Sequence, residues 1–518
     1  MRMKPIGIIV AALVVMFGAS SPGAATLDGV VKVGGVILDE EGDLSTVQET
    51  YNVHDGFAVA QVRLNGRFDT GNSFRLDVRD INLDSRQGEF VYRIPQRFKL
   101  RAGYDQSRQV FDPTRATSSE RKDFTVGAEV TAGRWFGVSG SFGYLTRTGD
   151  RLAFPAGSAS VLGTDYDNAL KVGQINVHGQ KGRRGAALSY QMSDYSDDVN
   201  AEAARTGRVV SARLYTPSFF YDKWTHMLRG AYGVRGLSDN NLEYTFANVQ
   251  YTGVVQPATA WRVRYNFEAN RVDNESNRLK TDRFQNNLDL TYFHSRGRIT
   301  GGYGYELNDD DRTLTKYNSW RAGATYRHGS RFSAKVDYAE RTKDDQEDLT
   351  LLKDVESSRI WGSLQLKPTD QVAFGGGYSK RERTLPDIAV SIEGDVVNGF
   401  GRYDLERWGS VSADYSYAND EYDDLAGRFD TESHIVTGRA ELTRISNLRL
   451  AGGVTYMDIG KDLDIEKSSL FAEGAYKILR DYTLEVHYNV YNYDDYILLD
   501  RYYTANVVRI NLVYDLKL

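Results

Sequence analysis

The sequence contains no cysteine among its 518 residues. Disulfide scaffolds, cysteine-based metal sites and covalent attachment of c-type haem to this chain are therefore excluded. Proline is scarce as well, with 9 residues against 49 glycines. The 7 histidines are scattered and form no His-Glu-x-x-His motif, so a zinc site of that kind is not expected. Any redox centre would have to belong to another protein.

Long hydrophobic runs are missing beyond the N-terminus, where no segment has the roughly 20 apolar residues that a transmembrane helix needs. The N-terminus itself has Arg2 and Lys4, an apolar stretch over residues 6–17 and small residues at 23–25. This order is typical of a secretory signal peptide, so we expect residues 1–25 to be removed and residues 26–518 to form one domain. Export without a helical anchor leaves a periplasmic protein, a secreted protein or an outer-membrane barrel.

An excess of positive charge is also missing. The formal net charge is −6, and it becomes −8 without residues 1–25, which contain Arg2 and Lys4 and no acidic residue. This balance argues against nucleic acid as the main partner. Charged residues make up 26% of the chain, which is too polar for a helical membrane protein. A β-barrel tolerates such a composition because only alternate residues meet lipid.

Alternation of apolar and polar residues is abundant, and it is clearest at the C-terminus. The apolar positions there are Val508, Ile510, Leu512, Tyr514, Leu516 and Leu518. Residues two apart share one face of a strand, so we expect this set to face lipid in the closing strand of an outer-membrane barrel. On this register, Leu512→Arg should impair insertion and Asn511→Arg should be mild.

The same alternation recurs along the whole chain. We count about 26 candidate strands, with a range of 24–28, beginning near 28–38 and ending at 502–518. Short turns such as 367–370 alternate with longer acidic links such as 343–355. The fold class predicted is all-β: a single large antiparallel transmembrane β-barrel in the bacterial outer membrane, with short periplasmic turns and longer external loops.

The polar residues between the apolar positions are expected to line the lumen. Both signs of charge occur among them, which suits water or a polar partner better than a lipid conduit. The lumen-facing candidates are Arg63, Arg67, Arg75, Asp77, Arg79, Lys99, Arg101, Arg262, Arg264, Asp289, Lys335, Asp337, Arg509 and Lys517. Tyr491, Tyr493 and Tyr503 lie near strand ends and are expected in the aromatic girdle at the lipid–water interface. Acidic clusters such as 420–424 are predicted in external loops; none has EF-hand spacing, and calcium binding there stays open.

The strand count also bears on the lumen. A barrel of about 26 strands is wider than porins of 16–18 strands, and the sequence offers no plug segment before the first strand. We therefore expect another component to occupy the lumen.

Four short segments, together with the strand count and the signal peptide, resemble a known family. They are 74–80, 103–105, 111–114 and 503–508. The chain resembles the MtrB/PioB-type outer-membrane porins of porin–cytochrome electron conduits, although it lacks the Cys-x-x-Cys of some members. The resemblance implies a barrel that sheathes a multihaem c-type cytochrome and supports transmembrane electron transfer. It also implies that this chain binds no cofactor and that haem belongs to the partner.

Three functions follow from these patterns. The first is the non-enzymatic sheath that the resemblance implies. The second is a wide diffusion porin, general or substrate-selective, in which the mixed-charge lumen acts as a sieve. The third is an outer-membrane hydrolase, which needs a Ser/His/acid cluster at one rim, and no such cluster stands out. We expect no enzyme activity and no catalytic, cofactor-binding or metal-ligating residues in this chain.

Overall fold

The computed structural model describes most of the chain after the predicted signal peptide. It covers residues 26–42, 55–110, 118–151, 163–199, 204–217, 223–237, 242–274, 279–310, 313–345, 355–385, 389–424, 427–443, 447–496 and 502–517. Residues 1–25 and Leu518 lie outside the described residues. Within these ranges, no helix is long and apolar enough to cross a membrane.

Strands make up almost all of the described chain. Their bounds are β1 Thr26–Gly42, β2 Gly56–Arg67, β3 Ser73–Arg79, β4 Arg86–Ile94, β5 Phe98–Val110, β6 Ser118–Ala132, β7 Phe136–Arg151, β8 Gly163–Lys181, β9 Arg184–Asp197, β10 Arg205–Pro217, β11 Trp224–Leu237, β12 Leu242–Ala258, β13 Trp261–Asn274, β14 Leu279–His294, β15 Gly297–Asp309, β16 Leu314–His328, β17 Phe332–Asp345, β18 Val355–Leu366, β19 Val372–Leu385, β20 Val390–Asp404, β21 Gly409–Asp424, β22 Gly427–Leu442, β23 Leu448–Lys461, β24 Ile465–Leu479, β25 Tyr482–Asp495 and β26 Tyr503–Lys517. A single 3₁₀ turn, η3 Glu406–Trp408, is the one helical element among the described residues.

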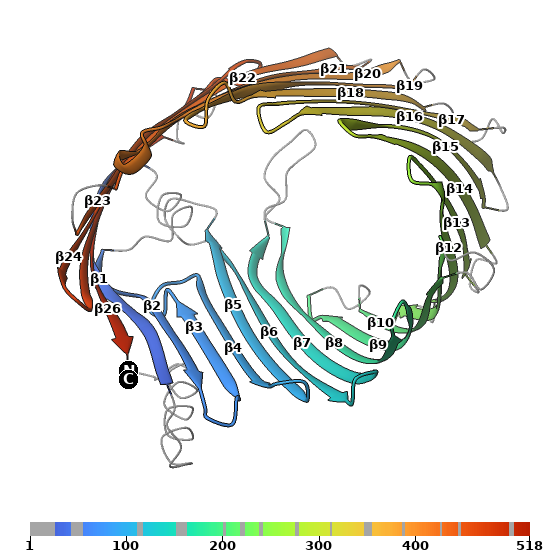
Figure 1. Cartoon of the computed structure of the whole chain (residues 1–518), viewed down its shortest axis with the longest axis horizontal. Helices are drawn as coiled ribbons and strands as arrows, with labels where there is room; N and C mark the ends of the chain where they lie inside the picture. The colour runs from blue at the N-terminus through green and yellow to red at the C-terminus, as the bar shows by residue number, and fades with distance from the viewer. Residues whose placement is uncertain are drawn as a thin grey trace.

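The strands form one closed antiparallel barrel. Each strand pairs with the next along the chain, and β26 pairs with β1, so the 26-stranded sheet has no free edge. Figure 1 shows this ring of strands, with the first and last strands side by side. Closure matters because unpaired backbone N–H and C=O groups cannot be satisfied in hydrocarbon. The predicted fold class and strand number are confirmed.

The sheet has one polar face and one apolar face. Directly paired residues lie on the same face of an antiparallel sheet, so faces can be followed from strand to strand. When same-face partners are traced from β26 through β1 to β25 and back to β26, each residue of β26 is assigned to the same face at the start and at the end. We call the face that carries Asp77, Asp289 and Arg509 the polar face. The other, which carries exposed Val436 and Leu470, is the apolar face.

The predicted closing-strand residues follow this division. Val508, Ile510, Leu512, Tyr514 and Leu516 lie on the apolar face. All of the predicted lumen-facing residues lie on the polar face.

The links at the two ends of the barrel differ in length, although less than the sequence predicts. Those at one end, here called the turn end, range from two residues (182–183) to six (218–223). Those at the opposite loop end range from two (425–426) to thirteen (43–55). All strands except β3 and β4 are longer than the roughly 9–11 residues needed to cross a bilayer, and they therefore take up much of the predicted loops.

The acidic segment 420–424 illustrates why. Although predicted in an external loop, it forms the end of β21, and its ladder continues to the pair Asp424 and Gly427. Arg428 in β22 forms an ion pair with Glu421 at 2.7 Å. Opposite charges across two strands stabilise their pairing, so the hairpin continues where an acidic sequence alone indicates a loop. Among the described residues, no group of three or more acidic or histidine side chains is arranged to hold a metal ion.

The closing seam between β1 and β26 corrects two expectations. Asn511 has an exposed fraction of 0% and lies beside Gly34, where an added Cβ would be 2.0 Å from the Ile510 carbonyl oxygen. Because the Asn511 side chain is fully covered, Arg at this position would have to displace its surroundings, and we expect Asn511→Arg to be costly and not mild. Tyr493 and Tyr503 stack at 5.4 Å on the polar face, so they do not belong to a girdle facing lipid.

The shortest hairpin, β3–β4, ends well before its neighbours. β3 has 7 residues, and its turn folds back onto β2 through backbone hydrogen bonds from Asp80 to Ala60 and from Ile81 to Val59. The Asn82 side chain then accepts from Val59 N at 2.9 Å and donates to the Phe57 carbonyl at 2.5 Å. A side-chain amide thus replaces one rung of the missing strand.

A matched pair of substitutions tests the two faces. Val436 and Thr437 are adjacent in β22 and lie on the apolar and polar faces, so they share one depth. We expect Val436→Arg to lower the stability of the lipid-inserted barrel by about 2–4 kcal/mol if it lies near the midplane, because Arg is costly on a lipid face. Thr437→Arg should cost under about 1 kcal/mol. Urea titration of the barrel in liposomes measures both, and equal losses would contradict the assigned register.

Candidate functional site

The predicted lumen-facing residues gather in three parts of the polar face. Seven of them lie on β2, β3 and β5: Arg63, Arg67, Arg75, Asp77, Arg79, Lys99 and Arg101. Five lie on β13, β14 and β17: Arg262, Arg264, Asp289, Lys335 and Asp337. Arg509 and Lys517 lie on β26. The first part is the densest group of charge, since only β4 separates β3 from β5.

In the second part the two carboxylates have basic partners. Asp289 Oδ1 forms an ion pair with Arg321 Nε at 2.6 Å, and Lys335 Nζ lies 2.6 Å from Asp337 Oδ2. Arg262 stacks over the Phe293 ring at 4.8 Å. Two of the charged pairs in this part are therefore compensated, whereas Arg262 and Arg264 contact neutral groups, since Arg264 Nε donates to Asn266 Oδ1 at 3.1 Å.

On β26, the register places Arg509 between His487 of β25 and Val36 of β1. Lys517 is the cross-strand partner of Asp28 at the turn end. These two positions lie far apart along the strand, so they do not form one site.

Asp77 is the centre of the first part. Its carboxylate is 6% exposed and accepts hydrogen bonds from Arg63 Nε at 3.1 Å, Arg75 Nη2 at 3.2 Å and Arg79 Nε at 3.3 Å. Gln61 Nε2 donates a further bond at 2.9 Å. Period-two spacing places Arg75 and Arg79 on either side of Asp77, and the register brings Arg63 opposite it. One carboxylate therefore orients three guanidinium groups.

A row of basic side chains lies between Asp77 and the turn end of the barrel, on β2, β4 and β5 and in the turn that joins β4 to β5. We call it the basic rim: Arg67 at the end of β2, Arg93 near the end of β4, Arg97 in the following turn and Lys99 at the start of β5. Arg93 and Lys99 are direct cross-strand partners, and Ser73 separates Arg67 from Arg93. Strands lie about 4.8 Å apart, so these side chains start within roughly 15 Å of one another. The Arg97 backbone is fixed by hydrogen bonds with Ile94 and Thr131.

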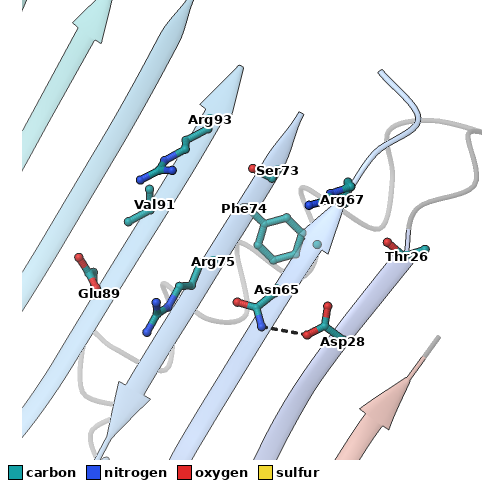
Figure 2. Close-up of a pocket in the computed structure, with 11 residues that line it drawn as sticks. Thr26, Asp28, Asn65, Arg67, Ser73, Phe74, Arg75, Glu89, Val91 and Arg93 are labelled. Carbon is teal, nitrogen blue, oxygen red and sulfur yellow. Dashed lines mark hydrogen bonds between the residues drawn. The ribbon is translucent and has the colours of Figure 1, made fainter. Parts of the chain in front are cut away.

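Two adjoining hollows open between these side chains. The first, of about 550 Å³, is lined by Arg67, Arg75 and Arg93 together with Asp28 and Glu89. Figure 2 shows its guanidinium groups on three neighbouring strands, with Asp28 accepting a hydrogen bond from Asn65 at 3.0 Å.

The second hollow, of about 610 Å³, is lined by all four residues of the basic rim and by one carboxylate, that of Glu129. The carboxylates of the first hollow already have partners, since Glu89 also pairs with Arg101 at 2.9 Å. Within the described residues, no salt bridge joins any of the four rim side chains to a carboxylate. This part of the polar face therefore has an excess of positive charge.

Sequence reasoning missed Arg93 and Glu89 because β4 is short. The signal was present, since Phe90, Tyr92 and Ile94 alternate with these two residues. Arg97 was missed for another reason: it lies in a turn, where alternation no longer applies.

Comparison with known proteins supports the fold alone. No protein-family model matches the sequence, and no curated protein matches it. Solved structures with a similar fold include the ferric enterobactin receptor PfeA from Pseudomonas aeruginosa, with a TM-score of 0.57 and 9% identity over 96% of this chain and 82% of that chain. The FrpB iron transporter from Neisseria meningitidis has a TM-score of 0.53 and 9% identity over 97% and 82% of the two chains. The siderophore receptor PirA from P. aeruginosa has a TM-score of 0.50 and 10% identity over 96% and 81%.

The chain is an outer-membrane β-barrel. The closed 26-stranded sheet and the likeness to these receptors both support this location. All three similar proteins are described as receptors or transporters, and none as an enzyme.

The resemblance to MtrB/PioB-type porins is wrong. The similar structures are siderophore and iron receptors, and no family model supports the resemblance. The electron-conduit function and the multihaem cytochrome partner were inferred from that family and are wrong with it. The physical reason is that alternating strands, aromatic residues and strand number are common to large barrels, so short matches such as 74–80 report the fold and not the function.

Asp77→Asn tests the electrostatic centre of the site. Loss of the carboxylate leaves three guanidinium groups facing a neutral amide, so we expect a loss of about 1–2 kcal/mol, limited by the half-exposed arginines. Adding Arg75→Gln should restore part of this, because one uncompensated charge is removed.

Asp420→Asn is the matched control, because the Arg381–Asp420 pair is well exposed and should contribute little. Urea unfolding in liposomes measures all of these variants. Losses of the same size for Asp77→Asn and Asp420→Asn would contradict the central role of Asp77.

Proposed function

We propose that this barrel carries polar solutes across the outer membrane, with its polar face lining the lumen. The observation that supports this most is the closed register, in which charged residues of both signs share one face around the whole barrel. A barrel keeps its apolar face toward lipid, so the opposite face meets water. A lumen of 26 strands is wider than that of porins with 16–18 strands, and it has room for large hydrated solutes.

We propose iron–siderophore complexes as the first class of solute to test. The support is the likeness in fold to PfeA, FrpB and PirA, which are described as receptors or transporters of siderophores or iron. In this proposal the chain acts by passage and binding, without catalysis. The predicted diffusion porin stays as the second candidate, because ion pairs such as Arg321–Asp289 suit a general aqueous wall.

Reconstitution tests this function. The purified barrel in planar bilayers should give ion conductance in discrete steps, and in liposomes it should admit ferric enterobactin faster than protein-free liposomes do. Val436→Arg protein that fails to insert is the negative control, because it shows how much conductance and uptake occur without an inserted barrel. Uptake that saturates with ferric enterobactin would favour a selective transporter. Passage of sugars graded only by size would favour the diffusion porin, and a barrel that conducts nothing would contradict both.

A further inference from the structure

We infer that the basic rim is an anion-binding site, through which the barrel selects solutes that carry carboxylate or phosphate groups. This inference rests on the proposed transport function and names its class of solute. It begins from a contrast within the polar face, where some acidic side chains lie close to basic ones. Glu306 lies between Arg283 at 2.7 Å and Arg341 at 3.3 Å, and Glu485 lies 2.5 Å from Lys32.

The basic rim departs from this pattern. Four basic side chains surround a hollow of about 610 Å³ that has one carboxylate, Glu129, on its wall. Glu129 is the cross-strand partner of Lys99, at one side of the row. A single carboxylate leaves most of the positive charge uncompensated, so an anion entering the hollow meets several donors at once. Rings of Arg and Lys are the groups that select anions and phosphate in other pores.

The chemistry of the rim favours oxyanions in particular. Arg67, Arg93 and Arg97 each present a planar guanidinium group, which pairs with carboxylate or phosphate through two parallel hydrogen bonds. Lys99 adds a compact charge on the strand beside Arg93. Hollows of about 550 and 610 Å³ lie within the range of small-molecule sites. These sizes favour a small anionic solute over a protein partner.

The position of the rim gives it a role in transport. It lies at the turn end, where the chain leaves β2, enters β5 and joins β4 to β5. Short turns face the periplasm in bacterial barrels, so in this orientation the rim borders the periplasmic mouth. An anion that has passed through the lumen along the polar face is then bound near the point where it leaves the barrel.

The experiment uses citrate and inorganic phosphate as probes and compares two triple variants. Arg67→Gln with Arg93→Gln and Lys99→Gln removes three charges from the rim. Arg213→Gln with Arg229→Gln and Arg439→Gln removes three charges from the polar face elsewhere and is the matched control. Arg67 and Arg93 are exposed, so their loss should leave folding intact. Arg93→Lys keeps the charge and serves as a milder variant.

Two independent readouts are needed. Calorimetric titration of the folded barrel in micelles should show citrate binding that the rim variant weakens about tenfold or more, since hydrogen bonds between charged groups are the strong ones. The control variant should bind within about threefold of the parent, because its rim is unchanged. Arg93→Lys keeps the charge but loses one set of paired hydrogen bonds, so its binding should fall between that of the control and that of the triple rim variant. In bilayers under a potassium chloride gradient, the parent should prefer chloride, and the rim variant alone should lose this preference.

The outcomes separate the inference from the proposed function. Citrate and phosphate binding that the rim variant does not weaken, or that the control variant weakens equally, would overturn the anion site even if the barrel conducts. Rim-dependent binding by a barrel that conducts nothing would support the site and overturn transport. A parent channel that prefers potassium would also overturn the inference.

Discussion

Closure of the backbone hydrogen-bond ladder is the constraint on which the rest of this structure depends. A sheet in lipid cannot leave an edge unpaired, so β26 must meet β1 in a register that keeps every neighbouring side chain on its proper face. The period of a strand is two, and a slip of one residue anywhere would exchange the polar and apolar faces beyond it. The uninterrupted polar face, the Asp77 centre and the basic rim all follow from that single register.

Much of the fold could be predicted because alternation is a local property. The strand over 508–516 and the strands on either side of it could be predicted from the residues within each strand alone. Strand ends were harder, since the acidic end of β21 is stabilised by Arg428 across the hairpin, a contact that no local pattern reveals. The face of Tyr493 was misjudged for a similar reason: aromatic residues near strand ends suit either the girdle or the interior, and only pairing with Tyr503 decides between them.

The site was harder than the fold. The alternation of the sequence placed the charges on the correct face, but it could not show which of them have an oppositely charged partner. Asp289 is paired with Arg321, whereas Arg67 has no carboxylate partner among the described residues. That distinction depends on residues far apart in the chain. The family resemblance failed for a related reason, because it rested on features that many barrels share. Function in such proteins lies in the few side chains that break the general pattern.

The short hairpin β3–β4 also affects the mechanics of the wall. The part of β2 nearest the loop end has a ladder with β1 on one side only, and on its other side it depends on the turn after β3 and on the amide of Asn82. Local opening begins where backbone hydrogen bonds are fewest. This sector is thus a place where the wall can open locally, next to the charged centre at Asp77. A local opening of the wall at this hairpin would therefore change the spacing of the three guanidinium groups that Asp77 holds.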